Sequence, residues 1–155
     1  MAKEIERKFL VDAEKWKDFK RNLHAENASI MQAYIGRTEK QTSRIRIKHV
    51  GKQDKAYFTI KGNSKGITRS EFEYEIPVED AKAMIAEFCD KYISKIRFTF
   101  SYKNKVWEVD EFDSPNPDLI LAEVELNSEN EECDYPDFVT DDVSTDPQYF
   151  NVNML

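Results

Sequence analysis

Charged residues alternate with apolar ones in several short stretches, and their types suit the binding of metal ions and phosphates. The stretch "KEIERKFLV" at residues 3–11 would place Glu4, Glu6 and Lys8 on one side of an extended chain. Carboxylates bind hard divalent cations through oxygen, whereas Lys and Arg bind phosphate oxygens, Arg in bidentate fashion. A polyphosphate that chelates a divalent cation would use both kinds of group.

The same alternation recurs along the chain, and several stretches carry mostly one sign of charge, such as "RIRIK" at residues 44–48. The alternating bases are Lys8, Arg44, Arg46, Lys48, Lys61, Arg69, Lys95 and Arg97. The alternating acids are Glu4, Glu6, Glu71, Glu73, Glu75, Glu108, Asp110, Glu123 and Glu125. A strand face that only meets water can also carry charge. Like charges about 7 Å apart on one strand repel, however, and such runs favour a charged surface that binds a ligand.

The two signs nearly balance on this surface, and a metal–polyphosphate complex would keep that balance. Two divalent cations add about +4, and a triphosphate subtracts about 4 to 5 charges. We therefore expect an anionic ligand that is bound together with Mg²⁺ or Mn²⁺.

The elements that must position these residues are mostly β-strands. Period-two patterns predict eight strands, at residues 3–11, 29–35, 43–50, 56–61, 68–76, 94–102, 105–112 and 120–126. Helical spacing predicts two helices, at 12–23 with Asp12 as the N-cap and at 77–92 with Ala81, Met84, Ile85, Phe88 and Cys89 as its apolar stripe. A further short helix is expected at 146–155, with Tyr149, Phe150 and Leu155 packed inward.

Short loops between successive strands predict an antiparallel sheet, and eight strands are enough to close a barrel. We expect an α+β fold, with an eight-stranded antiparallel β-barrel that forms a charged tunnel and helices packed outside. An open sheet with a charged concave face would show the same alternation. In either case two helices cannot cover the whole apolar face, so part of that face is a candidate homodimer interface.

Composition narrows the class of protein. The chain has 155 residues, a net charge of −7 and two cysteines, Cys89 and Cys133. We expect a single domain over residues 1–155. The acidic balance argues against a general nucleic-acid or anionic-membrane binder. No signal segment and no long apolar run are found in the sequence, which favours a cytoplasmic protein with reduced thiols.

These motifs together resemble the CYTH family, also called triphosphate tunnel metalloenzymes. The family's Glu-x-Glu-x-Lys signature is matched by Glu4, Glu6 and Lys8. The stretches "RIRIK", "TIKG", "RSEFEYEI", "KIRF", "EVDEF" and "LAEVEL" follow in family order. The resemblance covers nearly the whole chain and implies an eight-stranded tunnel that binds a triphosphate with divalent metal ions.

By this resemblance, catalytic and phosphate-binding roles would fall to Lys8, Arg44, Arg46, Lys61, Lys95 and Arg97. Lys48 and Arg69 share the same faces and are added as substrate-binding residues. The metal-binding set would be Glu4, Glu6, Glu71, Glu73, Asp110, Glu123 and Glu125. Arg7 and Glu111 point to the opposite face, and a structural role is expected for both.

The resemblance also implies a choice of activities. The family hydrolyses inorganic tripolyphosphate, hydrolyses thiamine triphosphate or cyclises ATP. The short chain is similar to small bacterial members, so we expect metal-dependent hydrolysis of inorganic tripolyphosphate to diphosphate and phosphate. The alternatives are an adenylate cyclase, a thiamine triphosphatase and a non-catalytic module that binds polyphosphate or nucleotides.

Overall fold

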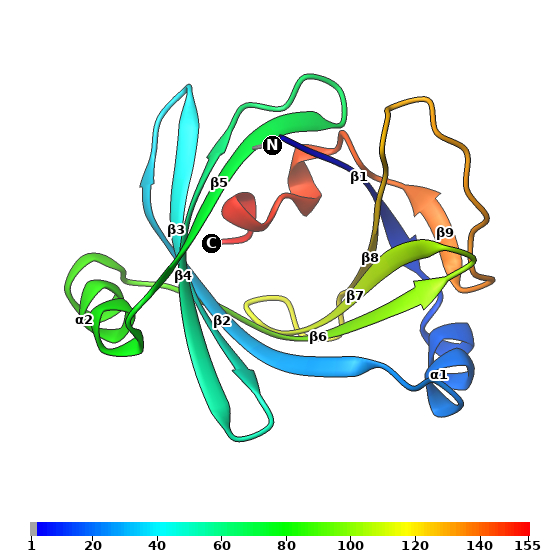
Figure 1. Ribbon diagram of the computed structural model, residues 1–155, viewed down its shortest axis with the longest axis horizontal. Helices are drawn as coiled ribbons and strands as arrows, with labels where there is room; N and C mark the ends of the chain where they lie inside the picture. Colours follow the sequence, from blue (N-terminus) through cyan, green and yellow to red (C-terminus); the bar gives the residue numbers. More distant parts are fainter. Residues whose placement is uncertain (1–2) are drawn as a thin grey trace.

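The computed structural model describes residues 3–155, which fold into a closed antiparallel β-barrel (Figure 1). The barrel strands are β1 (Lys3–Val11), β2 (Glu26–Arg37), β3 (Gln41–Val50), β4 (Gln53–Gly62), β5 (Thr68–Ile76), β6 (Ile93–Tyr102), β7 (Lys105–Ser114) and β8 (Ile120–Glu125). They are hydrogen-bonded in the order β5-β4-β3-β2-β6-β7-β8-β1, and β1 also pairs with β5. The predicted α+β fold with an eight-stranded antiparallel barrel is confirmed.

Strand β1 closes the ring by dividing its length between its neighbours. Its beginning pairs with β5, with Glu4 opposite Arg69, and its remainder pairs with β8, with Lys8 opposite Glu123. A ninth strand, β9 (Val139–Asp142), covers the free edge of β1 beyond its pairing with β5. An uncovered strand edge invites pairing with another chain, so β9 protects this part of the barrel. The sequence patterns did not predict β9.

The two predicted helices are present and shorter than expected. Helix α1 (Ala13–Arg21) begins after Asp12, whose carboxylate accepts a hydrogen bond from the Lys15 amide at 3.0 Å, which confirms the predicted cap. Helix α2 (Val78–Phe88) packs against β2, β3 and β4. Its stripe includes the buried Ala81, but Phe88 is 57% exposed and does not belong to it. The chain becomes extended at Cys89, directly after Phe88, so no later turn of helix covers that ring.

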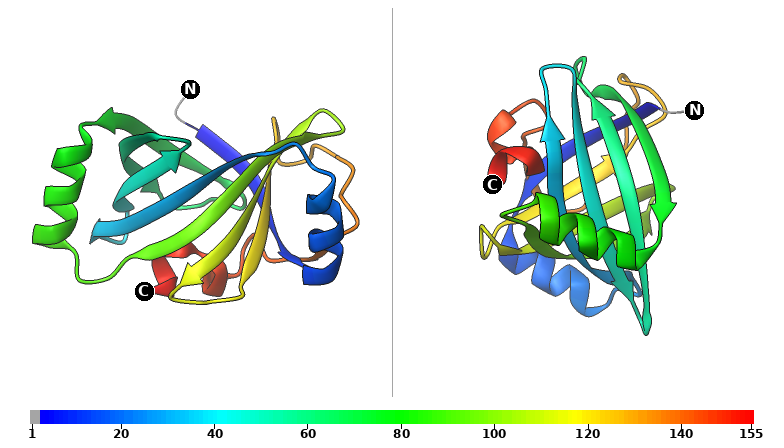
Figure 2. Two further views of the ribbon diagram at one scale, coloured as in Figure 1. Left: turned by 90° about the horizontal axis from the view of Figure 1, so that it is seen from below. Right: turned by 90° about the vertical axis from the view of Figure 1, so that its left-hand side faces the viewer.

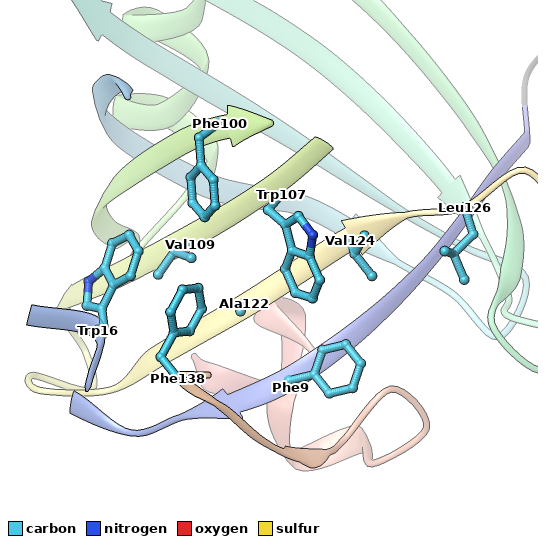
Figure 3. Close-up of a cluster of buried hydrophobic side chains, with 9 residues drawn as sticks. All are labelled: Phe9, Trp16, Phe100, Trp107, Val109, Ala122, Val124, Leu126 and Phe138. Atoms are coloured by element: carbon cyan, nitrogen blue, oxygen red, sulfur yellow. The ribbon is translucent and has the colours of Figure 1, made fainter. Parts of the chain in front are cut away.

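The main hydrophobic core lies outside the barrel, between its apolar outer face and the elements that cover it. Figure 3 shows Trp16 of α1 and Phe138 of the segment before β9 beside side chains of the barrel strands. The buried members of this main core are Phe9, Trp16, Phe100, Trp107, Val109, Ala122, Val124, Leu126 and Phe138. A smaller cluster, with Ile45, Ile47, Ala56 and Ala81, lies under α2. The alternate side chains of the same strands are thereby left to face the barrel interior.

The C-terminal segment, residues 143–155, lies across one end of the barrel (Figures 1 and 2). It contains two short 3₁₀ helices, η1 (Pro147–Tyr149) and η2 (Asn151–Met154), in place of the single predicted helix. Tyr149 and Leu155 pack, as predicted, against a third apolar cluster that includes Ile93 and Leu121. Phe150 instead lines the barrel cavity. Within residues 3–155, no helix combines the length and apolar character that a membrane crossing requires.

Candidate active site

Charged side chains from the barrel strands meet in an internal cavity of about 180 Å³. The cavity is lined by Glu4, Glu6, Lys8, Tyr34, Thr42, Arg44, Arg46, Thr59, Lys61, Arg69, Glu71, Glu73, Arg97, Glu108, Glu123, Glu125, Phe150, Asn151 and Val152. Each strand contributes alternate residues, because its remaining side chains are turned outward toward the helices or solvent. Most of the residues selected from the sequence are therefore brought together.

Three of the selected residues do not line this cavity. Lys95 and Asp110 are buried behind it, with 1% and 2% of their surface exposed. Lys48 lines a separate hollow together with Glu26, Lys55 and Tyr57. The roles assigned to these three residues stay predictions.

Glu75 and Glu108, the two alternating acids to which no role was assigned, differ in their positions. Glu108 lines the cavity, whereas Glu75 lies outside it and is 4.0 Å from Lys55.

Arg7 and Glu111 face outward, as expected. Arg7 binds Asp142 at 3.3 Å, and Glu111 accepts hydrogen bonds from Trp16 at 2.8 Å and Lys20 at 2.7 Å. Glu111 thus fastens α1 to the outer face of β7.

A buried network of charged hydrogen bonds supports the basic side of the cavity. Arg97 donates from Nε and Nη2 to the two oxygens of Asp110, at 2.7 and 2.9 Å. Lys95 donates to the same carboxylate at 2.7 Å, and Arg97 also reaches Glu108 at 3.1 Å. Burial raises the pKa of Asp110, but Arg97 and Lys95 outweigh it and hold that pKa well below its usual range. Asp110 therefore stays ionised and fixes both cations.

On the acidic side, Glu4 is the centre of a second network. It accepts hydrogen bonds from Lys61 at 2.9 Å and Arg69 at 3.0 Å, and Lys61 also contacts Glu71 at 3.0 Å. Burial opposes ionisation of Glu4, yet the neighbouring Lys61 and Arg69 hold its pKa well below the usual range. Glu4 is thus a carboxylate that already has its countercharge.

Glu6 has the opposite environment. Burial raises its pKa well above the ordinary value, and the nearby carboxylates of Glu123 and Glu4 raise it further. Burial also raises the pKa of Glu71 and of Glu125, which lies opposite Glu6 across the β1–β8 pair. Carboxylates crowded in this way repel one another and favour binding of a cation between them.

The donor chemistry of this group fits a hard divalent cation, because carboxylate oxygens are the ligands such ions prefer. Glu6, Glu123 and Glu125 come from neighbouring strands and face the same cavity. Within residues 3–155, no three such groups are already gathered at the spacing of a formed metal site. These carboxylates and oxygens of the substrate would therefore together complete the coordination of the cation.

Neutral polar residues of the cavity were missed in sequence, because only ionised positions were selected. Tyr34, Thr42 and Thr59 line the cavity, and Thr59 donates a hydrogen bond to Glu73 at 2.7 Å. Thr59 shares the strand face of Lys61, so its position in the pattern was visible. Asn151 and its neighbours in the C-terminal segment carried no such signal, because that segment has no strand periodicity.

A closed barrel with an ionised interior, which combines crowded carboxylates with fixed Arg and Lys groups, defines a tunnel for a metal–polyanion complex. The chain belongs to the CYTH domain family, whose pattern matches residues 2–152. An inorganic triphosphatase of Acetivibrio thermocellus is 39% identical over 156 residues, which cover 100% of this chain and 94% of that protein.

Solved structures agree with this assignment of the fold. The crystal structure of an inorganic triphosphatase superposes with a TM-score of 0.61 at 25% identity, covering 99% of this chain and 94% of the other. A protein of Pyrococcus horikoshii superposes with a TM-score of 0.63 at 20% identity, covering 82% of this chain and 80% of the other.

Proposed function

We propose that this protein hydrolyses inorganic tripolyphosphate to diphosphate and phosphate in a divalent-metal-dependent reaction. The observation that carries the proposal is the meeting of Glu-x-Glu-x-Lys, Arg44, Arg46 and Arg97 in one cavity inside the barrel. The full-length similarity to an inorganic triphosphatase supports the same reaction class. Family membership implies a divalent metal, and we propose Mg²⁺ or Mn²⁺.

The basic residues would bind the phosphate oxygens and stabilise the charge that develops in the transition state. Lys8, Arg44, Arg46 and Arg97 face the cavity from three strands and could contact different phosphoryl groups. Water would attack the terminal phosphorus in line with the bridging oxygen. The phosphoanhydride bond then breaks, diphosphate leaves, and the new P–O bond is in orthophosphate.

The metal would be held by carboxylates of β1 and β8, namely Glu6, Glu123 and Glu125, with substrate oxygens completing its shell. When bound, a divalent cation polarises phosphoryl oxygen and lowers the pKa of coordinated water. Glu4 is already paired with Lys61 and Arg69, so its proposed part is to fix those two cations. Asp110 would act in the same way on Lys95 and Arg97, behind the cavity.

Product analysis tests the proposal directly. Tripolyphosphate, thiamine triphosphate and ATP are each incubated with Mg²⁺, Mn²⁺ or EDTA, and phosphate and pyrophosphate are quantified separately. We expect metal-dependent phosphate release, fastest with tripolyphosphate. Pyrophosphate release from ATP with a cyclic nucleotide would identify a cyclase, and tight binding without turnover would identify a binding module. Either result would refute the proposed hydrolysis.

A further inference from the structure

Arg46 differs from the other arginines of the cavity in the partner that holds it. Arg97 is 2.7 Å from Asp110, and Arg69 is 3.0 Å from Glu4. Arg44 is 3.9 Å from Glu73. Arg46 instead donates from Nε and Nη2 to Oε1 of Gln32, at 3.2 and 3.1 Å. Its hydrogen-bond partner is therefore a neutral amide.

Gln32 occupies a position that fixes this amide tightly. It lies on β2 directly opposite Arg46 on β3, and none of its surface is exposed. Its Nε2 donates to the hydroxyl of Tyr34 at 3.4 Å, so both ends of the amide have partners. Burying an amide is costly unless its hydrogen bonds are made, and at this position an apolar side chain would avoid the cost. The contact with Arg46 is what an apolar residue could not supply.

The electrostatic surroundings of Arg46 make the neutrality of its partner important. Burial lowers the pKa of Arg46 to about 9, with the charges of Arg44 and Arg97 acting in the same direction. The carboxylates of Glu73 and Asp110 oppose this shift without outweighing it. Arg46 also lines the cavity, where a phosphate oxygen would reach it. A carboxylate at position 32 would reduce the repulsion that Arg46 experiences from Arg44 and Arg97. It would also neutralise the charge of Arg46 before any phosphate was bound.

We propose that Gln32 is a positioning residue, which orients the Arg46 guanidinium toward a phosphate oxygen of the substrate without adding a carboxylate that would neutralise its charge. This inference rests on the proposed function, since it names a requirement of the same phosphate-binding site. It separates two properties that a carboxylate partner would combine, namely the orientation of the guanidinium and the neutralisation of its charge.

Two substitutions separate these properties. Gln32→Glu keeps the acceptor and nearly the same volume but adds a negative charge, whereas Gln32→Met keeps the length and removes the acceptor. Gln53→Glu is the matched control, because it makes the same charge change at an exposed position of β4 that does not line the cavity. For each variant, Tm, kcat and KM for tripolyphosphate with Mg²⁺ are measured, together with tripolyphosphate binding in EDTA by calorimetry.

We expect Gln32→Glu to keep the Tm of the wild type or exceed it, while KM rises and affinity in EDTA falls, each by tenfold or more. Gln32→Met should lower kcat by about 10- to 100-fold, because a loosely held guanidinium loses its orientation. Gln53→Glu should leave kcat, KM and affinity in EDTA within twofold of the wild type and its Tm unchanged.

A purely structural role for Gln32 predicts a different result, since glutamate would keep the acceptor for Arg46 and could accept a hydrogen bond from the Tyr34 hydroxyl, so activity would be preserved. Wild-type KM and affinity in Gln32→Glu would overturn the proposal, even if Gln32→Met fails to fold. The proposed function fails separately, if the wild type binds tripolyphosphate but releases no phosphate. In that case the affinity measurement in EDTA still decides the role of Gln32.

Discussion

Replacing Asp110 with asparagine should destabilise the protein more than any single loss of charge on the outer surface. Asp110 accepts hydrogen bonds from Nε and Nη2 of Arg97 and from Nζ of Lys95, all at 2.7–2.9 Å. The side chains of Asp110 and Lys95 are 3% and 0% exposed. Asparagine would keep the shape of the side chain but leave two buried cations without their shared countercharge.

Removing one partner of a buried ion pair costs about 3–5 kcal/mol, because the remaining charge is neither paired nor solvated. At the heat-unfolding midpoint of a chain of this length, that loss corresponds to a fall of roughly 6–20 °C in Tm. Lys95 can reduce part of the cost by losing its proton. Burial, with help from Arg97 and Arg46, already lowers its pKa to about 7 in the presence of Asp110.

This proton loss sets the pH dependence. Without Asp110 the pKa of Lys95 falls further, so at pH values just below 7 the folded variant binds fewer protons than the folded wild type. Stability rises with pH wherever the unfolded state binds more protons, so the deficit of the variant should shrink from pH 6 to pH 8. What remains at pH 8 is the cost of Arg97, which loses Asp110 and keeps only its contact with Glu108.

Unfolding in urea, followed by the fluorescence of the buried Trp16 and Trp107, measures this effect. Glu111→Gln is the matched control, because it removes a carboxylate from the next residue of the same strand. Its partner Lys20 is 36% exposed, and partly exposed pairs contribute about 0–1 kcal/mol. If Asp110→Asn were no more destabilising than Glu111→Gln at pH 6, the buried network would not have the importance assigned to it.

Three further predictions concern the cavity and the outer face. Lys8→Ala should lower tripolyphosphate turnover about 10²–10³-fold, while Lys20→Ala on the outer surface keeps it; near-normal turnover by Lys8→Ala with excess Mg²⁺ would contradict the assignment. Because the pKa of Glu6 is raised in the folded state, the metal-free protein should lose stability as pH rises above the ordinary glutamate value of 4.5. Mg²⁺ should restore that stability. If the Tm in EDTA did not change with pH in the wild type, as in Glu6→Gln, the result would argue against crowding of the carboxylates around Glu6. Phe72 and Tyr74 are 46% and 60% exposed on the outer face of β5, so a homodimer with twice the 18.2 kDa mass is predicted; light scattering that gives a monomer would refute it.

The alternation of charged and apolar residues was enough to predict the eight barrel strands and most of the cavity. This worked because the two faces of each strand meet different environments, so residue type at every second position reports which face is inside. Asp12 was found as a cap for a similar reason, since its side chain binds a backbone amide only three residues away.

The elements that were missed depend on contacts between distant parts of the chain. Strand β9 is a short segment that pairs with β1 across more than a hundred residues, and its own residues carry no alternating pattern. Gln32 is uncharged, so its importance becomes visible only when β2 places it opposite Arg46. Lys95 and Asp110 share the strand faces of the cavity residues, but their mutual hydrogen bond and burial place them behind the cavity.

The separation of the hydrophobic core from the binding cavity explains how the barrel tolerates so many ionised residues. Buried ion pairs seldom stabilise a protein more than apolar side chains of the same volume would. Here most of the apolar side chains pack on the outside, where Trp16, Phe138 and Ala81 cover the barrel strands. A third cluster, around Ile93 and Leu121, packs against the C-terminal segment at one end of the barrel. Stability can therefore come mainly from this outer packing, and the interior is free to be arranged for charge. It follows that replacing a charged interior residue should be costly for folding mainly when it leaves another buried charge without its partner, as at Asp110. Substitutions of bases that line the cavity should affect binding far more than stability.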